Sequence, residues 1–465
     1  MHNLTHSTNL THSNNSNKFN NLSSPSDAIY QYTKNIGILA YIYGYAPVVF
    51  QALMSYDLIY RAPMNTMYFY KALTTPTVQP FYAPNSDDLY ATAWIDLTNT
   101  PVLITTPNTI KQNRWYTIQL LSIYSDTFAN LPGLNKNQPS KKYILVGPGK
   151  SINNNIFIDA EIISAPTNIV YLVSRVAVKD TRDLILASYI QHQITVTELV
   201  SHAPVLSIDL IPETIYTDLN FFNVMLDVMN YNGYFTSEIA LVDQFKTIGL
   251  NPNVKFDPNS STPIVRLALI DAIEIAIKQI ISYGYLYLNN LMSSTNWMSG
   301  TNIGTYDNKY LIRSFVSYIG PGANVPTEEL YMSTTDDING KQLNGLNNKY
   351  LMHFSANSYP KVNSKWGFWS ITLYVENKKS QSPGYNLQLY PNQQNKYTIN
   401  SSTNDLVYNS DGLLDIYIQN DPPKNFNLIN WLPAPNGPFQ LVIRIYAATL
   451  QQINDLSNIP SVVPI

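Results

Sequence analysis

The sequence predicts a mainly β protein with a helical middle, an α+β fold in which two β-sandwich domains are joined by a helical segment. Short stretches in which apolar and polar residues alternate fill residues 90–178 and return between residues 350 and 446. Proline and glycine separate these stretches, as they do in sandwiches and barrels. Between the two β regions, three stretches within residues 183–292 carry apolar residues at helical spacing.

The composition limits the classes of function. A length of 465 residues suggests two or three domains. Charged residues make up 13% of the chain, the net charge is −3 and no basic cluster is present, so we expect no nucleic-acid partner. The chain has no cysteine, which excludes thiol catalysis, disulfides and cysteine-bound metals. Low charge density weakens repulsion between copies of the chain, and we therefore predict self-association.

The first 26 residues are rich in Asn and Ser, and we predict a disordered tail. The pentapeptide NLTHS occurs in it twice. Four Asn-x-Ser/Thr acceptors are weak candidates for glycosylation, because such matches arise by chance in this composition; they begin at Asn3, Asn9, Asn14 and Asn21. No charged region precedes an apolar core, so we predict no cleavable secretory signal.

A run without charged residues follows at residues 35–56. It is long enough to raise the question of a membrane span. Gly37, Gly44 and Pro47 interrupt it, however, and tyrosines place hydroxyl groups along its middle, where lipid would offer them no partner. We therefore predict a buried helix, with no transmembrane segment and no membrane insertion.

Changes in the spacing of apolar residues divide the remaining chain into predicted domains. Residues 27–180 form an N-terminal domain with this helix and the first set of strands, which are introduced by the turn sequence Pro84-Asn85-Ser86-Asp87. Residues 181–300 form a helical linking region, with helices over 183–198, 214–229 and 263–292. Residues 301–448 form the C-terminal β domain, and residues 449–465 are predicted to be a second tail.

The stretch from Asp411 to Tyr446 predicts a β-hairpin. Every second residue is apolar over 414–418 and again over 441–445, which places Arg444 and Tyr446 on the face opposite the core. A two-stranded unit is marginally stable in water, so this hairpin needs further sheet on which to lie.

Motifs spread over most of residues 30–447 carry a family resemblance. In the N-terminal half they are Tyr43-Gly44-Tyr45, Pro84-Asn85-Ser86-Asp87, Arg114-Trp115-Tyr116, Val146-Gly147-Pro148-Gly149 and Arg175. In the C-terminal half they are Tyr310 with Arg313, Gly322-Ala323-Asn324, Glu329 with Tyr331, Phe368-Trp369-Ser370, Asp411-Gly412 and Asn430-Trp431-Leu432-Pro433-Ala434-Pro435. With these motifs the chain resembles the paired families known as domains of unknown function 1254 (N-terminal) and 1214 (C-terminal).

The resemblance implies a β-rich N-terminal domain, a helical linking part and a jelly-roll-like C-terminal sandwich. It implies no particular reaction. The chain also departs from the family pattern, because Asp88 stands where members commonly carry Thr and Ser122 where they commonly carry Asp. The Asn-, Ile- and Tyr-rich composition resembles that of proteins from AT-rich genomes, such as those of giant DNA viruses of amoebae.

A candidate binding site combines an amide, carboxylates, an arginine and phenols, which together suit a polyol or sugar. Its predicted members are Asn85, Asp87, Asp88, Tyr90, Arg114, Tyr116, Gln119 and Tyr124. Trp369 and Trp431 would add an aromatic platform for a sugar ring. The structural alternative is that Asn85 and Asp87 build a turn, Arg114 satisfies a buried carboxylate, and the tryptophans pack between two sheets.

The sequence patterns of metal sites, nucleophilic serines and phosphate-binding loops are absent. The histidines show no ligand spacing such as H-E-x-x-H, so we predict no metal site. No G-x-S-x-G turn and no phosphate-binding glycine loop is present, so we expect no cofactor.

The sequence therefore favours a non-catalytic surface or particle-associated structural or binding protein. A giant-virus virion component that binds glycans or self-associates fits this description, with the virion, or otherwise the cytoplasm, as its location. The alternative is a hydrolase for a carbohydrate or ester, in which Asp87, Arg114 and a histidine supply acid, base and anchoring groups.

Overall fold

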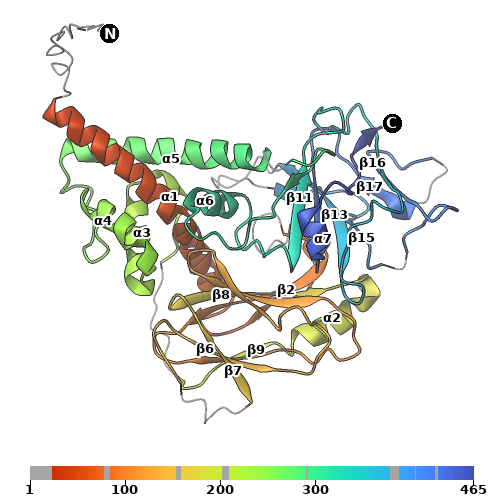
Figure 1. Cartoon of the computed structure of the whole chain (residues 1–465), viewed down its shortest axis with the longest axis horizontal. Helices are drawn as coiled ribbons and strands as arrows, with labels where there is room; N and C mark the ends of the chain where they lie inside the picture. The colour runs from red at the N-terminus through yellow and green to blue at the C-terminus, as the bar shows by residue number, and fades with distance from the viewer. Residues whose placement is uncertain are drawn as a thin grey trace, which may run out of the picture.

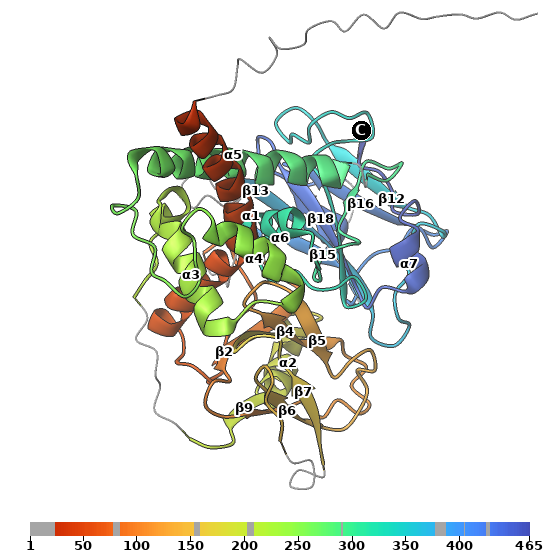
Figure 2. The ribbon, with the colours of Figure 1, turned by 60° about the vertical axis from the view of Figure 1, so that its left-hand side comes forward.

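The computed structural model describes residues 24–465 except 78–83, 153–158, 202–208, 290–291, 377–386, 404 and 425–427. Of the predicted N-terminal tail, residues 1–23 lie outside the described residues, with the acceptors Asn3, Asn9, Asn14 and Asn21. Residues 25 and 26, also expected in the tail, begin the first helix. The described chain forms two β-sandwiches and a group of helices, and both ribbon views show these as three adjoining parts (Figures 1 and 2). The predicted fold class, mainly β with a helical middle, is confirmed.

The N-terminal sandwich consists of a five-stranded and a four-stranded sheet. The first has the order β1 (Tyr68–Phe69), β2 (Asp88–Asp96), β8 (Ile169–Ala177), β4 (Tyr116–Ser122) and β5 (Thr127–Leu131). The second has the order β7 (Ala160–Ser164), β6 (Lys142–Val146), β3 (Val102–Thr105) and β9 (Thr195–Glu198). Leu89, Ile95 and Leu172 of the first sheet share a core with Ile104 and Leu145 of the second. Residues of β2 and β8 that alternate with this core point to the opposite face.

Helices cover that opposite face of the five-stranded sheet (Figure 1). They are α1 (Pro25–Tyr60), α3 (Asn220–Asn232), α4 (Ile239–Lys246), α5 (Pro263–Asn289) and α6 (Tyr310–Ile319). Tyr90, Trp94 and Tyr171 of the sheet belong to the same core cluster as the middle of α1. Helix α2 (Leu184–Gln191) lies elsewhere, against β2 and β8. Short 3₁₀ helices occupy Thr181–Asp183, Glu213–Thr217, Thr236–Glu238 and Leu428–Asn430.

Helix α1 contains the uncharged run that raised the question of a membrane span. It is the one helix among the described residues that is long and apolar enough to cross a membrane, and 67% of its most apolar window is buried inside the protein. Gly37 lies so close to α5 that a Cβ atom there would come within 2.9 Å of the Ala272 side chain. Such burial against a neighbouring helix agrees with the predicted buried helix.

The C-terminal sandwich also has two sheets. The larger has the order β10 (Met298–Ser299), β11 (Glu329–Thr334), β18 (Gln440–Tyr446), β13 (Phe368–Glu376) and β14 (Leu387–Leu389), with β15 (Thr398–Asn400) also paired to β13. The smaller has the order β17 (Trp431–Pro433), β16 (Leu414–Gln419), β12 (Tyr350–Phe354) and β19 (Val463–Pro464). Leu330, Ile371 and Ile443 pack against Met352 and Ile416 between the two sheets.

The predicted hairpin from Asp411 to Tyr446 is wrong. Its two strands, β16 and β18, lie in different sheets of the sandwich. β16 pairs with β12 and β17, whereas β18 lies between β11 and β13. The two-residue alternation correctly identifies the core-facing residues of both strands, but it says nothing about which strand is the neighbour.

Four further segments differ from the predictions. The helix expected over 183–198 ends at Gln191, and Thr195–Glu198 is strand β9. Helices α4 and α6 were not predicted. Residues 449–465, expected to be a tail, contain helix α7 (Leu450–Asn454) and strand β19, and Ile459 and Val462 are buried in the C-terminal core. Pairing of β19 with β12 supplies the backbone hydrogen bonds that hold this segment in place.

A carboxylate at the end of α1 makes stability depend on pH. Asp57 accepts hydrogen bonds from Arg61 Nη1 (2.5 Å) and Trp94 Nε1 (2.9 Å), and it is 3% exposed. Burial raises the pKa of Asp57 to about 6, against the opposing effects of Arg61 and Trp94. The folded protein then binds this proton more tightly than the unfolded chain does, so the contribution is largest below the unfolded pKa of about 4 and is lost as pH rises to about 6.

We therefore expect the Asp57 contribution to the free energy of unfolding to fall by about 2–3 kcal/mol between pH 4 and 6. Urea unfolding of the wild type and of Asp57→Asn across this range measures it, because subtracting the two curves removes the other titrating groups. A difference curve that stays flat, or that rises with pH, would contradict the assignment.

Candidate ligand-binding site

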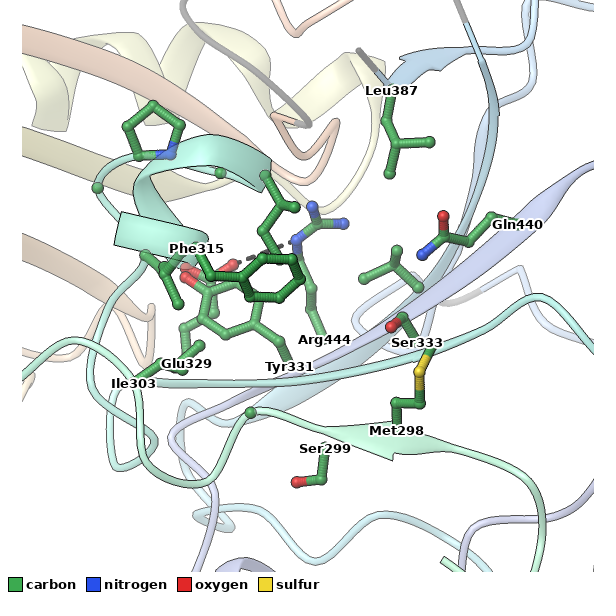
Figure 3. A pocket seen from close by; sticks show the side chains of 18 of the residues that line it. Met298, Ser299, Ile303, Phe315, Glu329, Tyr331, Ser333, Leu387, Gln440 and Arg444 are labelled. Carbon is green, nitrogen blue, oxygen red and sulfur yellow. Dashed lines mark ion pairs between the residues drawn. The ribbon is translucent and has the colours of Figure 1, made fainter. Parts of the chain in front are cut away.

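A cavity of about 400 Å³ lies where the two sandwiches and the helices meet. Strands β11 and β18 form one wall, and α6 contributes Phe315 (Figure 3). The N-terminal sandwich contributes Tyr90 and Arg175. This volume is within the range of about 300–1,000 Å³ that is usual for small-molecule sites. It is more enclosed than a second hollow, which residues of α3 and α5 line together with the segment 255–259.

Strand alternation brings polar residues to this wall. Leu330 and Met332 of β11 point into the C-terminal core, so Glu329, Tyr331 and Ser333 point to the cavity. In β18 the same rule places Leu441, Ile443 and Ile445 in the core and Gln440, Val442 and Arg444 at the cavity. Two charged residues of the face opposite the core are buried: Glu329 is 1% and Arg444 is 3% exposed.

Two arginines from different sandwiches flank Glu329. Arg175 Nε lies 3.6 Å from Glu329 Oε2, and Arg444 Nε lies 3.4 Å from Glu329 Oε1. Figure 3 marks the pair between Glu329 and Arg444 by dashes. All three groups are almost completely buried. A buried charge is tolerated only when it is paired, so Glu329 joins the two domains electrostatically.

The Arg175 guanidinium is held in a fixed orientation. Its Nη1 donates to Gln119 Oε1 (2.7 Å), and its Nη2 donates to the carbonyl oxygen of Gly322 (3.0 Å). The Tyr90 ring lies with its centroid 5.5 Å from the guanidinium carbon. These contacts leave Arg175 little rotational freedom at the edge of the cavity.

Residues 322–324, one of the motifs of the C-terminal half, form the cavity edge that receives these bonds. Besides the bond from Arg175 to Gly322, Gln119 Nε2 donates to the Ala323 carbonyl (3.1 Å) and Asn130 Nδ2 donates to Asn324 Oδ1 (3.0 Å). Gly322 has a φ of +82°, in the left-handed region that favours glycine. The conformation of this segment thus docks the C-terminal half onto the N-terminal sandwich.

The rest of the lining is mainly apolar. It includes Met298, Ile303, Val316, Ile319, Leu387 and Val442. A ligand that fills the cavity must therefore present an apolar body to these side chains and place its polar groups near β11 and β18.

Asp87 lies beyond the cavity, between the two sandwiches. Its carboxylate accepts hydrogen bonds from Ser370 Oγ (2.5 Å), Tyr446 OH (2.9 Å), Thr398 Oγ1 (3.2 Å) and Asn400 Nδ2 (3.2 Å). Burial raises the pKa of Asp87, and the Ser370 bond opposes this rise. All four donors come from the C-terminal sandwich, so Asp87 is a second polar anchor between the domains.

Asp88 is buried without a charge partner of its own. Its Oδ2 accepts a hydrogen bond from Asn85 Nδ2 (2.8 Å), while its Oδ1 has no hydrogen-bond partner among the described residues. Burial and the nearby charge of Glu329 raise the pKa of Asp88 well above its usual range. Its surroundings therefore favour the protonated form of Asp88 more than water does.

The structure brings some of the sequence-predicted site residues together. Asn85 Oδ1 accepts the backbone N–H of Asp87 (2.9 Å), the Asn85 N–H donates to Tyr90 OH (3.3 Å), and Tyr90 lines the cavity. Gln119 lies behind the cavity, where it orients Arg175. The turn expected for Asn85 and Asp87 is present, and it places both residues at the junction of the domains.

Other predicted residues lie elsewhere. Arg114 pairs with Asp183 through two hydrogen bonds (2.7 and 2.5 Å), which is the structural alternative stated for it. Tyr116 is buried between the N-terminal sheets. Tyr124 lies under the helices, where its hydroxyl donates to the Gly233 carbonyl (2.6 Å).

The two predicted platform tryptophans are both buried in the C-terminal sandwich. The Trp369 ring stacks on Phe354 with 4.9 Å between centroids, and Trp431 Nε1 donates to the Gln419 carbonyl (2.9 Å). These contacts are those of packing residues, and a role in sugar binding stays a prediction.

Four charged residues line the cavity, and none of them was predicted as a site residue: Arg175, Glu329, Asp336 and Arg444. A signal for two of them was present: Arg175 stands in IVYLVSRVA and Arg444 in QLVIRIY, each the only charged residue of a mainly apolar strand. In a chain with few charges, such a residue indicates a buried ion pair. Among the described residues no group of three or more His, Asp or Glu side chains could hold a metal ion.

Two family models match this protein, one in each half of the chain. The family described as "Protein of unknown function (DUF1254)" matches residues 64–198, and the family described as "Protein of unknown function (DUF1214)" matches residues 328–450. The protein belongs to these paired families. Arg175 lies in the region of the 1254 domain, and Glu329 and Arg444 lie in that of the 1214 domain, so the Arg175–Glu329 ion pair joins the two domains.

One solved structure shows the same fold, and a second has a lower similarity. The VPA0106 protein from Vibrio parahaemolyticus is 20% identical, with a TM-score of 0.67, and the match covers 93% of this chain and 100% of that one. A putative uncharacterized protein from Burkholderia cenocepacia is 10% identical with a TM-score of 0.45, covering 95% of this chain and 96% of the other. A search of curated proteins returned no match.

Proposed function

We propose that this protein is a non-catalytic binding protein that holds a small, uncharged and largely apolar molecule in the cavity between its 1254 and 1214 domains. The observation that supports this proposal is the cavity of about 400 Å³, with its apolar walls and a few polar groups along β11 and β18. Pockets of this kind, placed between domains, are the usual form of small-molecule sites.

The charges of the lining favour an uncharged ligand. Arg175 and Arg444 carry two positive charges, and Glu329 and Asp336 carry two negative charges. These charges already balance, so a charged ligand would bring an unpaired charge into a buried site, which is costly.

The hydrolase alternative has less support. It assigned acid, base and anchoring roles to Asp87 and Arg114, but four donors surround Asp87 and Asp183 pairs with Arg114. Neither residue, and no described histidine, belongs to the cavity lining. A glycan ligand, self-association and residence in a virion stay predictions from composition and residue type.

A fluorescent probe tests the binding proposal. Prodan is an uncharged naphthalene dye with a ketone group, and we expect it to bind the wild type more tightly than anilinonaphthalene sulfonate, a dye of similar shape that carries a negative charge. Val442→Phe places a larger side chain in the cavity, and we expect it to weaken prodan binding by at least about tenfold. Val407→Phe, at a position 40% exposed and outside the cavity, is the matched control and should bind as the wild type does.

Fluorescence titration of the wild type, Val442→Phe and Val407→Phe with both dyes measures these affinities. Failure of the wild type to bind prodan, or equal binding by the two Val→Phe variants, would reject the cavity as a ligand site. Preference for the sulfonate dye would reject the argument from charge balance.

A further inference from the structure

Tyr331 lines the cavity, and its hydroxyl oxygen already accepts one hydrogen bond. The Tyr331 oxygen accepts the backbone N–H of Asn324 (3.0 Å). Among the described residues, no hydrogen bond donated by the Tyr331 hydroxyl is found. The Tyr331 hydroxyl can therefore donate a hydrogen bond to a ligand in the cavity.

The position of this hydroxyl is set from two sides. Tyr331 is on β11, which is paired on both edges, with β10 and with β18. Its bond partner Asn324 is fixed by Asn130 of the N-terminal sandwich (3.0 Å). Because the oxygen is engaged by a rigid backbone N–H, the proton has few directions left, and a donor held in this way selects for an acceptor on the ligand.

The neighbouring groups decide what kind of acceptor fits. Glu329 lies two residues from Tyr331 on the same face of β11, so its carboxylate would repel a carboxylate or phosphate that approached the hydroxyl. A ketone, ester or amide carbonyl accepts a hydrogen bond without a charge. Ser333, next on the same face, adds a hydroxyl for which no hydrogen bond is found among the described residues.

We propose that the ligand carries an uncharged carbonyl oxygen that accepts a hydrogen bond from Tyr331 OH, and that Tyr331 is the residue that selects for it. This inference rests on the proposed function, and it goes further by naming the polar group of the ligand. The apolar body of the molecule then lies against Met298, Ile319 and Val442.

The test compares two probes in one variant. Tyr331→Phe keeps the aromatic ring and removes only the hydroxyl. We expect it to weaken binding of prodan by about tenfold, as loss of one buried hydrogen bond does, and to shift the emission of bound prodan to shorter wavelength because the ketone loses its donor. Binding of dimethylaminonaphthalene, which lacks the ketone, should stay within about twofold of the wild type.

The measured quantity is the ratio of the prodan affinity to the dimethylaminonaphthalene affinity of Tyr331→Phe. Partial unfolding would weaken the binding of both probes alike, so it would leave this ratio unchanged. Tyr408→Phe, at a position 50% exposed and outside the cavity, is the control for loss of a tyrosine hydroxyl. If prodan binds the wild type and Val442→Phe blocks it, but Tyr331→Phe leaves the ratio and the emission unchanged, the carbonyl assignment is wrong while the binding function stands. If the wild type does not bind prodan at all, the binding function itself is rejected.

Discussion

Replacing Glu329 by glutamine is expected to lower the free energy of unfolding by about 3–5 kcal/mol, because it leaves Arg175 and Arg444 buried without their shared carboxylate. Glutamine is close in shape to glutamate, so the loss reports the charge rather than a cavity in the core. Urea unfolding followed by circular dichroism at neutral pH measures the change.

Asp88→Asn is the matched control for Glu329→Gln, since both change a buried carboxyl group of one cluster into an amide. If Asp88 is protonated in the folded protein, asparagine replaces an uncharged group, and we expect a change within about 1 kcal/mol. Equal losses in the two variants would contradict the assignment of the proton to Asp88.

The double variant Glu329→Gln/Asp88→Asn refines this test. Without the charge of Glu329, Asp88 can give up its proton and compensate part of the positive charge of Arg175. The double variant lacks this compensation, so its loss should exceed the sum of the two single losses. A loss equal to that sum would show that Asp88 and Glu329 do not exchange charge in this way.

Removing one member of the Lys136–Glu328 pair should have an effect of the same size. Lys136 Nζ lies 2.8 Å from Glu328 Oε1, and the two side chains are 1% and 2% exposed. Burial lowers the pKa of Lys136 and raises that of Glu328, which shows how strongly each depends on its partner for its charge. We expect Lys136→Met to lower the free energy of unfolding by about 3–5 kcal/mol, because Glu328 is then buried unpaired.

Two control variants distinguish the loss of a buried ion pair from other causes of instability. Lys136→Met/Glu328→Leu removes both charges, and it should recover most of the loss, because apolar residues of similar volume can replace a buried ion pair. Lys278→Met breaks the ion pair with Glu274 on the surface of α5, where the side chains are 69% and 68% exposed, and should change stability by at most about 0.5 kcal/mol. A double variant as unstable as Lys136→Met would point to packing as the cause instead.

Local patterns predicted much of this fold correctly. The alternation in QLVIRIY identified Leu441, Ile443 and Ile445 as core residues of β18, and all three are fully buried. The turn chemistry of Asn85 and Asp87 was also read correctly, because a side-chain oxygen that bonds to the backbone two residues later needs no distant partner. These features depend on neighbouring residues alone.

The errors arose where a distant partner decides the structure. The alternation in β16 and β18 suited a hairpin as well as two strands in separate sheets, because a two-residue period specifies a buried face and not a neighbour. Residues 449–465 carry little periodicity, and they became ordered through pairing of β19 with β12.

The sequence by itself determined the two families, the fold class and the core-facing residues, since these follow from motifs and from the spacing of apolar side chains. The tertiary structure alone decided the site. Arg444 and Tyr446 lie on the face opposite the core, which a period of two leaves open to solvent or to a second domain. Docking of the N-terminal sandwich buried that face, and so brought Arg175 to Glu329 and closed the cavity beside Tyr331, through contacts between strands that lie more than a hundred residues apart in the chain.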